Sequence, residues 1–428
     1  MSEISYSSIS SLEYYNIFEN ITDNEFNDII NSIEDLFHEY INNYSYNMKD
    51  HKFSDTCSHA ISTELFNTWY DGHLCNDSSF DNIYSLVESN VYRLFVINDI
   101  PHYTSYNYDF NHSVSHINDI LTKLSNKHQP VQKSKEWYAL RNNILSASSM
   151  WKLFRSPSVK ANYIKEKANP NKHYFGSYSQ IPSLEWGNKY EPVSIMIYQD
   201  KYDTIVGEYG CILHDKYNFI GASPDGINVK QNSPLYGRML EIKNIYNRFI
   251  TGIPKEDYWI QMQIQMETCN LDVCDFLETR FIEYTEREFY NDSIHTYKGV
   301  ILQFSKIIHD HDNIFKSEIN TPLFIYYPIH KCLEYDDIHN WIHSQKNKYS
   351  DTHILYTTQY WFLDELSCLI VKRNKHWFNS VIHHIQNSWN DILELKNNKK
   401  KIEVTINTDN NYVISNIDNT SPIKVIKN

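Results

Sequence analysis

Three ionisable residues, Asp225, Glu241 and Lys243, lie in sequence contexts that could bring them around one divalent cation. Side chains alternate between the two faces of a β-strand, so Glu241 and Lys243 are expected to point to the same side. Asp225 lies in the turn-forming run Pro224-Asp225-Gly226, where a hairpin would return the chain beside Glu241. Two carboxylates suit Mg²⁺ or Mn²⁺, and a nearby lysine can stabilise charge that develops on a phosphate. The pattern predicts a metal-dependent site that cleaves phosphodiester bonds.

Each of these patterns also has a purely structural interpretation. Glu-x-Lys is a common solvated pair on a strand, and Pro-Asp-Gly is among the most frequent turns. Taken singly, each would be read as structural. The interpretation as a site depends on the further motifs that flank them on both sides.

Hydrophobic periodicity and turn residues indicate the elements that must position these residues. Eight of the ten glycines lie between residues 176 and 252, which marks this region as tightly turned. The patterns predict helices at 136–154, 184–200 and 254–269, and strands at 204–213, 217–223, 237–244 and 273–284. Further strands are expected at 298–304, 323–327, 353–357 and 365–372, and a closing helix carries the apolar stripe Trp377, Val381, Ile385, Trp389 and Ile392.

The net charge of −14 is unevenly distributed along the chain. Residues 1–130 hold 19 acidic against 5 basic side chains, so the remainder is neutral overall. Within that remainder, residues 131–180 hold nine lysines and arginines against two glutamates. A basic stretch therefore leads into the carboxylate region, as a phosphate-binding protein requires, although most of these lysines would also suit a solvated helix face.

Five short motifs resemble those of the phage lambda exonuclease and YqaJ-type viral recombinase family, and they occur in the family's order. They are Glu136-Trp137-Tyr138-Ala139-Leu140-Arg141 with Leu145-Ser146-Ala147-Ser148, Trp186-Gly187-Asn188-Lys189-Tyr190-Glu191-Pro192, Ala222-Ser223-Pro224-Asp225-Gly226, Leu240-Glu241-Ile242-Lys243, and Tyr258-Trp259-Ile260-Gln261-Met262-Gln263. The resemblance implies a PD-(D/E)XK nuclease fold of the α+β class, in which helices flank a central mixed sheet.

The resemblance also implies roles for individual residues. It assigns metal ligation to Asp225, Glu241 and the backbone carbonyl of Ile242, and the catalytic lysine position to Lys243. Two Mg²⁺ or Mn²⁺ ions are the cofactor it implies. Two further matches are Glu191, an extra carboxylate that can ligate or position a metal, and Gln263, which supports the lysine. The alternatives are that Glu191 is a helix-surface acid and Gln263 a core amide.

A second implied site would hold a terminal 5′-phosphate. Arg141 and Ser148 correspond to the family residues that bind this group. The chemistry is suitable, because a guanidinium fork and a hydroxyl beside helix amides make a strong phosphate pocket. His309-Asp310-His311-Asp312 and the pair His383-His384 receive no role, since chance clustering explains them in a chain with 20 histidines.

The expected organisation has three parts: an acidic, mainly helical extension at 1–130, a nuclease domain at 131–396, and a Lys/Asn-rich polar tail at 397–428. An amphipathic pattern at 26–40 predicts a helix in the extension, which would dock a partner or shield the nuclease. The extension, a long loop between Asp225 and Glu241, and Asn244 in place of a proline that many relatives have are departures from the family. They leave the oligomeric state open.

These observations favour a Mg²⁺-dependent nuclease, expected to be a 5′-to-3′ exonuclease on duplex DNA ends in viral recombination, repair or replication. The alternatives are a structure-specific or restriction-like endonuclease, and a DNA-binding scaffold without cleavage. Expected partners are double-stranded DNA ends, a single-strand annealing protein and further copies of the chain. The absence of long apolar runs and the seven cysteines without a CxxC pair predict a soluble intracellular protein, in the host cytoplasm or at the site of viral DNA replication.

Overall fold

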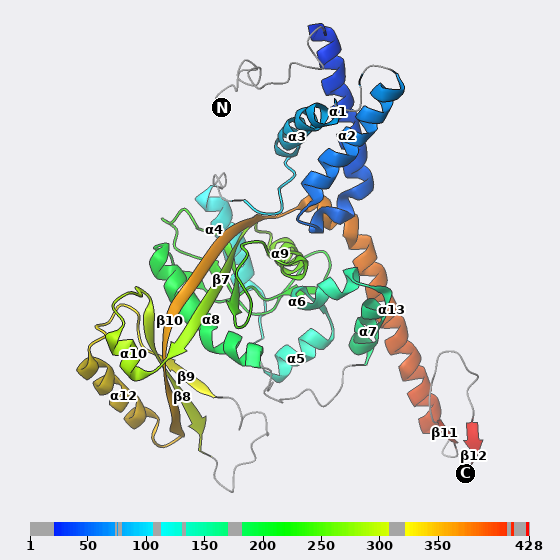
Figure 1. The fold of residues 1–428 in the computed structure, drawn as a ribbon. Coiled ribbons are helices and arrows are strands. Elements are labelled where there is room, and N and C mark those ends of the chain that lie inside the picture. Colours follow the sequence, from blue (N-terminus) through cyan, green and yellow to red (C-terminus); the bar gives the residue numbers. More distant parts are fainter. Residues whose placement is uncertain are drawn as a thin grey trace.

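The computed structural model describes residues 21–72, 75, 79–105, 113–130, 134–169, 182–307, 322–408, 412–414 and 425–427. Within these ranges the chain is a mixed α+β protein, so the predicted fold class is confirmed (Figure 1). The first helices are α1 Asp23–Tyr44, η2 Ser45–Lys49, α2 Phe53–Asp71, α3 Phe80–Ile97, α4 Val114–Asn126, α5 Lys135–Asn142, α6 Ala147–Met150, η4 Trp151–Phe154 and α7 Pro157–Ala168. The later helices are α8 Pro182–Lys201, α9 Glu256–Cys269, α10 Glu286–Asn291, α12 Tyr335–Tyr349 and α13 Lys375–Thr408.

A seven-stranded sheet in the order β2-β5-β6-β7-β10-β8-β9 forms the centre of the molecule. Its strands are β2 Val206–Gly207, β5 Gly226–Asn228, β6 Met239–Ile245, β7 Val273–Tyr284, β8 Lys298–Lys306, β9 Leu323–Tyr326 and β10 His353–Lys372. Only β6 and β7 pair in parallel within this sheet, and α9 makes the crossover between them, as a parallel connection requires. Smaller sheets hold β1 Leu145–Ser146, β4 Ile220–Ala222 and β3 Ile212–Leu213, and β11 Tyr412–Ile414 with β12 Val425–Lys427.

The strand β6 is covered on both faces, and this explains its sequence. Leu240 and Ile242 pack with Tyr198 of α8 in one buried cluster. The alternate residues, Glu241 and Lys243, face α9, where Gln265 bonds the carboxylate of Glu241. A strand between two helices therefore carries an apolar face toward α8 and a polar face toward α9.

Several predicted elements are confirmed and others are corrected. The strand β7 covers the predicted 273–284, and α8, α9 and β6 lie within two residues of their predicted bounds. The single helix expected at 136–154 is wrong, because β1 interrupts it to pair in parallel with β4. The strand expected at 204–213 divides into β2 and β3, which join different sheets. The two late strands expected at 353–357 and 365–372 are parts of one bulged strand, β10.

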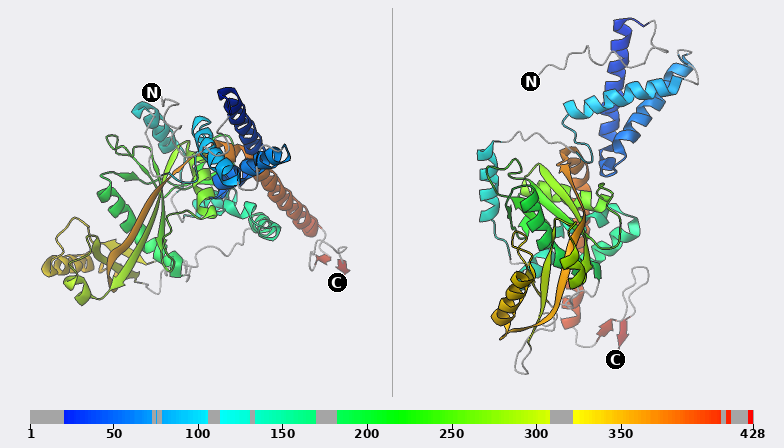
Figure 2. Two further views of the ribbon diagram at one scale, coloured as in Figure 1. Left: turned by 45° about the horizontal axis from the view of Figure 1, so that its top comes forward. Right: turned by 60° about the vertical axis from the view of Figure 1, so that its left-hand side comes forward.

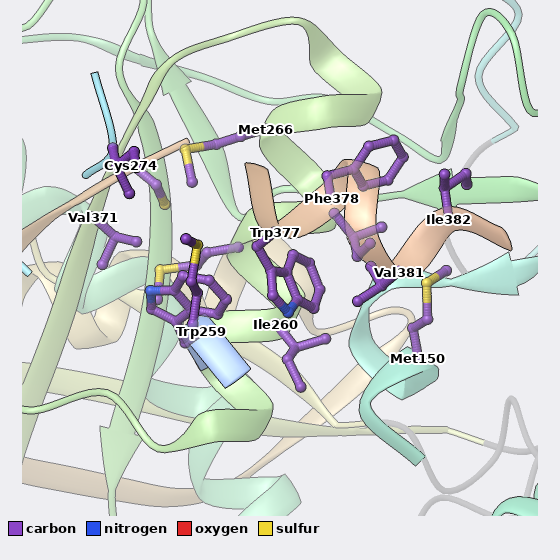
Figure 3. Close-up of a cluster of buried hydrophobic side chains, with 14 of the residues drawn as sticks. Met150, Trp259, Ile260, Met266, Cys274, Val371, Trp377, Phe378, Val381 and Ile382 are labelled. Atoms are coloured by element: carbon purple, nitrogen blue, oxygen red, sulfur yellow. The ribbon is translucent and has the colours of Figure 1, made fainter. Parts of the chain in front are cut away.

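The predicted closing helix is α13, and it buries its apolar stripe in the main core (Figure 3). Trp377 is fully buried, and its ring meets that of Trp259 on α9 edge to face at 5.2 Å between centroids. Phe154 lies beside the same ring at 5.6 Å. The helix continues past residue 396, so the expected boundary between domain and tail falls inside α13.

The N-terminal helices α1, α2 and α3 form a bundle beside the part of the chain that holds the seven-stranded sheet (Figures 1 and 2). α1 covers the helix predicted at 26–40, and it buries Ile33, Phe37 and Ile41 on one side. By contrast, α4, which belongs to the same predicted extension, packs against the part that holds the seven-stranded sheet, where Lys123 and Lys127 pair with Asp215.

A second lobe surrounds the other end of β10. There α10, α12, β8 and β9 lie together (Figure 1). They hold a separate apolar cluster around Phe289, Leu302 and Ile338. Among the described residues, no helix is both long and apolar enough to cross a lipid bilayer.

Candidate active site

The predicted triad meets between β6 and α9. Asp225 lies in the turn just before β5, and β5 pairs antiparallel with β6 through Gly226 and Leu240. Its carboxylate Oδ2 accepts a hydrogen bond of 2.7 Å from the backbone N–H of Ile242. Because this N–H lies between Glu241 and Lys243 in the chain, the bond fixes Asp225 beside both side chains.

Glycine at position 226 allows this close approach. A Cβ atom added to Gly226 would lie 2.1 Å from Cγ1 of Val206 on β2. Any larger residue would therefore push β2 away from β5 and disturb the turn that carries Asp225. The Pro-Asp-Gly run is thus both a turn signal and a packing requirement.

Glu241 is fully buried and has a partner on each oxygen. Its Oε1 accepts a hydrogen bond from the ammonium of Lys243, and its Oε2 accepts one of 2.8 Å from the amide of Gln265. Lys243 also lies over the ring of Tyr258, 4.8 Å from its centroid, in a cation–π contact. The lysine side chain keeps 21% of its surface exposed, so the site is not closed off from solvent.

The positive charge of Lys243 does not fully offset the burial of Asp225 and the negative charges around it. Burial raises the pKa of Asp225 well above its ordinary value, and the nearby charges of Glu241 and Glu191 raise it further against the opposing effect of Lys243. Burial lowers the pKa of Lys243, but the attraction of Glu241 and Asp225 outweighs it and the net pKa is raised. Lys243 is therefore charged at neutral pH, while Asp225 resists ionisation.

Glu191 approaches this group from α8. It is half-buried, and its charge acts on the pKa of Asp225. A buried polar network fixes its helix against the sheet: the hydroxyls of Ser194 on α8 and Thr279 on β7 both donate to Oδ1 of Asn244, at 2.6 and 2.8 Å. Asn244, noted in the sequence as a departure from the family, thus ties α8 to the strand that carries Glu241.

Gln263 is not among the residues that meet here. Its amide donates to the carbonyl of Lys372 at 2.9 Å, and its oxygen accepts from the backbone N–H of Asn374 at 2.7 Å. The expected support of the lysine by Gln263 is therefore corrected: this glutamine joins α9 to the end of β10. Two residues along a helix differ by about 200° in direction, so Gln263 and Gln265 face opposite sides.

The sequence analysis did not single out Gln265 and gave no role to Tyr258, the first residue of the fifth motif, although a signal for both was present. The two residues are seven apart, so they lie two turns apart on the same face of α9. A strand that presents Glu241 and Lys243 to one helix face needs polar partners on that face. The family motif contains Gln261-Met262-Gln263 and so directs attention to Gln263. The seven-residue spacing from Tyr258 would instead have selected Gln265.

The residues present fit a divalent cation by their donor chemistry. The carboxylates of Asp225 and Glu241 are hard oxygen donors. Burial, and then the charge of Glu241, raise the pKa of Asp225, and a bound cation would offset both effects. Among the described residues, no group of three or more His, Cys, Asp or Glu side chains is arranged to hold an ion. The candidate set therefore consists of two carboxylates and the expected carbonyl of Ile242.

The two predicted phosphate-binding residues lie together in a basic cluster with Ser146 and Lys167. The guanidinium of Arg141 lies 3.5 Å from the hydroxyl of Ser146 and 3.4 Å from that of Ser148, and it covers the ring of Trp137 at 4.5 Å. Lys167 donates to the backbone carbonyl of Arg141 at 2.8 Å. Burial and the nearby charge of Arg141 lower the pKa of Lys167 to about 8.

The helix α6, which begins just after Ser146, packs against β4 and against α9, the helix that carries Gln265 and Tyr258. Burial also lowers the pKa of Arg141. Two cations held close together with lowered pKa values are what an anion would stabilise. This basic cluster therefore has the electrostatics of an anion site.

The histidine groups noted in the sequence lie elsewhere. His384 on α13 is placed within 3.0 Å of the carbonyl of Leu153, and residues 309–312 lie outside the described part of the chain.

A family model described as the YqaJ-like viral recombinase domain matches residues 136–272. This range includes all the predicted site residues, and the match confirms the resemblance inferred from the five motifs. The chain is also 30% identical over 319 residues to "Uncharacterized protein R354" of Acanthamoeba polyphaga mimivirus. That alignment covers 67% of this chain and 56% of the viral protein, so the chain spans little more than half of that relative's length.

Solved structures with partial similarity are described as exonucleases. The structure of LHK-Exo in complex with dAMP is 19% identical, with a TM-score of 0.37 over 64% of this chain and 100% of that one. The alkaline exonuclease LHK-Exo from Laribacter hongkongensis is 18% identical, with a TM-score of 0.35 over 64% and 99%. A phage related exonuclease from Haemophilus somnus 129PT is 13% identical, with a TM-score of 0.33 over 61% and 96%.

The raised pKa of Asp225 predicts that Asp225→Asn stabilises the metal-free protein. The folded state holds this proton more tightly than the unfolded chain, so wild-type stability falls as pH rises from the ordinary value of 3.8 through the raised pKa. Asparagine does not ionise, so the unfolding free energy of the variant should not fall in this way. Its excess over the wild type should grow across that pH window to roughly 1–3 kcal/mol, since one pKa unit is about 1.4 kcal/mol.

Urea unfolding in EDTA, followed between about pH 4 and pH 9, measures this difference. The matched control is Asp351→Asn at an exposed position, which should follow the wild type at every pH. An Asp225→Asn protein that is less stable than the wild type at high pH would contradict the electrostatics described above.

Proposed function

We propose that this chain, whose residues 136–272 match the YqaJ-like viral recombinase domain, is a Mg²⁺-dependent DNA nuclease that degrades duplex ends in the 5′-to-3′ direction. The observation that carries the proposal is the convergence of Asp225, Glu241 and Lys243 around one backbone N–H and one helix face. Two acids that repel each other are costly to stability in the absence of a cation. Such an arrangement is typical of a site kept for chemistry.

The protein side of the reaction follows from these positions. Asp225, Glu241 and the carbonyl of Ile242 would hold the cation, which supplies polarisation of the scissile phosphate and a lowered pKa of the attacking water. Lys243, charged and partly exposed, stabilises negative charge on the phosphate or orients the water. Gln265 and Tyr258 fix Glu241 and Lys243, and Glu191 adds negative charge from the side of α8.

The 5′-to-3′ polarity rests on the basic cluster at Arg141 and Ser148, which would form the pocket for a terminal phosphate. A guanidinium already oriented by two hydroxyls and an indole ring can bind a terminal phosphate through two parallel hydrogen bonds. A single-strand annealing protein as partner, further copies of the chain, and action in the host cytoplasm or at the site of viral DNA replication belong to the same proposal.

One cleavage experiment separates the candidate functions. Purified protein is incubated with end-labelled linear duplex and with closed circular duplex, with and without Mg²⁺. The exonuclease proposal predicts Mg²⁺-dependent loss of the linear DNA alone, reduced roughly 10³-fold or more in Asp225→Asn. Cutting of circles would replace it with an endonuclease, and binding without products would replace it with a scaffold.

The terminal-phosphate pocket predicts a second result. Arg141→Ala should reduce the ratio of cleavage rates on 5′-phosphorylated and 5′-hydroxyl ends to about one, a loss of roughly tenfold or more for a charge-assisted bond. The ratio is insensitive to a general loss of folded protein. Arg155→Ala is the matched control, because Arg155 is also a cation over an indole, that of Trp151, and lies outside the pocket. An unchanged ratio in Arg141→Ala would reject the assignment.

The two glutamines of α9 should separate by phenotype. Gln265→Leu removes the donor to Glu241 and should reduce cleavage by roughly 10–100-fold, as outer partners of metal ligands do. Gln263→Leu removes this partner of the Lys372 carbonyl and the Asn374 N–H, so it should lower the unfolding free energy by about 1–3 kcal/mol. The cleavage rate per folded molecule should change only a few-fold. Urea unfolding and initial rates measure the two effects. The reverse pattern would favour the sequence assignment over the structure.

A further inference from the structure

A cleft of about 610 Å³ lies in the N-terminal part of the chain, between the first turns of α2, the helix α3 and the segment 101–104 (Figure 1). This volume is within the range of about 300–1,000 Å³ that is usual for sites of organic ligands, and it is much larger than a single ion. Among the described residues, no group of His, Cys, Asp or Glu side chains is arranged to hold a metal. We therefore expect an organic occupant.

The rim of this cleft is acidic. Asp50, Asp55 on α2 and Glu88 on α3 are all exposed there. Burial raises the pKa of Tyr84, and the charges of Glu88 and Asp55 raise it further, so the two carboxylates approach one hydroxyl from two helices. None of the described residues that line the cleft is a lysine or an arginine. These charges disfavour a phosphate and favour a cationic group.

An imidazole held between two aromatic rings forms part of the wall. The ring of His102 stacks on Tyr92 and Phe95 of α3, with centroids 5.0 and 5.2 Å away. Burial, and then the charge of Lys372, lower the pKa of His102, so its ring is neutral at neutral pH and does not offset the acids. Its Nε2 is buried and has no hydrogen-bond partner among the described residues. In the tautomer with the proton on Nδ1, this nitrogen would accept from an N–H donor of the occupant.

The lining of the cleft is supported by the rest of the molecule. Tyr103, one of the lining residues, stacks on Trp259 of α9 at 5.3 Å between centroids, and its hydroxyl donates to the carbonyl of Pro254 at 2.9 Å. Phe53 on α2 lies edge to face against Phe95 on α3, at 6.3 Å. The walls are therefore held in place without an occupant, which lowers the entropy cost of binding.

The rim continues into apolar surface on α3. Tyr92, which also lines the cleft, and Val96 are each 61% exposed, and they lie one helical turn apart on the same face. Ile97, the next residue, is 58% exposed. Exposed apolar surface beside charged residues is typical of a contact with another protein. A small organic cation would leave this surface uncovered, whereas a protein segment can cover it.

We propose that this cleft binds a basic segment of a partner protein. A lysine or arginine side chain of the partner enters between α2 and α3, and apolar residues beside it pack on Tyr92 and Val96. The aliphatic stem of such a side chain suits the aromatic walls, and its charged end suits Asp55 and Glu88. The inference concerns the N-terminal helices, so it does not depend on the proposed nuclease function.

Binding of synthetic peptides to the full chain, followed by fluorescence anisotropy in EDTA without DNA, tests the proposal. The probes are short fluorescein-labelled peptides with a lysine or arginine one or two helical turns from a leucine. Each has a twin with glutamate in place of the basic residue and a twin with serine in place of leucine. The basic peptides should bind more tightly than both twins. Asp55→Asn with Glu88→Gln should weaken binding by roughly 3–10-fold, and Tyr92→Ala by roughly fivefold or more.

Two controls separate this cleft from general attraction to an acidic protein. Asp35→Asn with Glu39→Gln removes the same two charges from exposed positions on α1, and Tyr356→Ala removes a 73% exposed ring from β10. Both should bind the peptides as the wild type does. All the substituted side chains are exposed, so the fold should remain intact.

Three results would overturn the proposal. Glutamate twins that bind as tightly as the basic peptides, or no peptide binding at all, would reject a cationic occupant. Equal affinities of the cleft variants and the control variants would place the peptides elsewhere on the surface. Serine twins that bind as tightly as the leucine peptides would reduce the occupant to a cation alone. Sedimentation of the protein without peptide covers the remaining case, because a dimer that Asp55→Asn with Glu88→Gln dissociates would assign the cleft to a second copy of the chain.

Discussion

The enclosure of two carboxylates and one ammonium between a strand and a helix is the constraint on which the rest of the structure depends. A buried acid beside another acid is unfavourable unless a cation or hydrogen bonds compensate it. Here Lys243 and Gln265 compensate Glu241, and the N–H of Ile242 compensates Asp225 only in part, as its raised pKa indicates. The residual repulsion is the physical basis for expecting a divalent cation.

Such a site stays assembled only because rigid elements hold its members. The strand β6 has its apolar face buried against α8, so it cannot turn Glu241 toward solvent without exposing Leu240 and Ile242. The Ser194–Asn244–Thr279 network and the bonds of Gln263 fix α8 and α9 relative to the sheet. Residues that touch no reacting atom therefore determine the geometry of those that do.

The sequence allowed the strands β6 and β7, the helices around them and the meeting of the triad to be predicted, because all three depend on local periodicity and turn chemistry. It did not separate Gln263 from Gln265, because a motif match does not say which face of a helix meets the strand. It also joined α5 to α6, because β1 exists only through its pairing with β4, a contact distant in sequence. The Arg248–Glu278 pair was missed for the same reason, since it links residues 30 apart whose encounter depends on the parallel register of β6 and β7.

The acidic N-terminal module is connected to the site through the first turn of α9. Lys49 at the end of η2 pairs with Glu256 at 3.2 Å, and the hydroxyl of Tyr103 donates to the carbonyl of Pro254 at 2.9 Å. The ring of Tyr103 stacks on Trp259, 5.3 Å between centroids, and Trp259 donates to the Tyr103 carbonyl. These contacts hold the helix start immediately before Tyr258, the residue that covers Lys243. The N-terminal extension is therefore part of what positions α9. It is a departure from the compact family pattern, and it supports the helix that completes the candidate site.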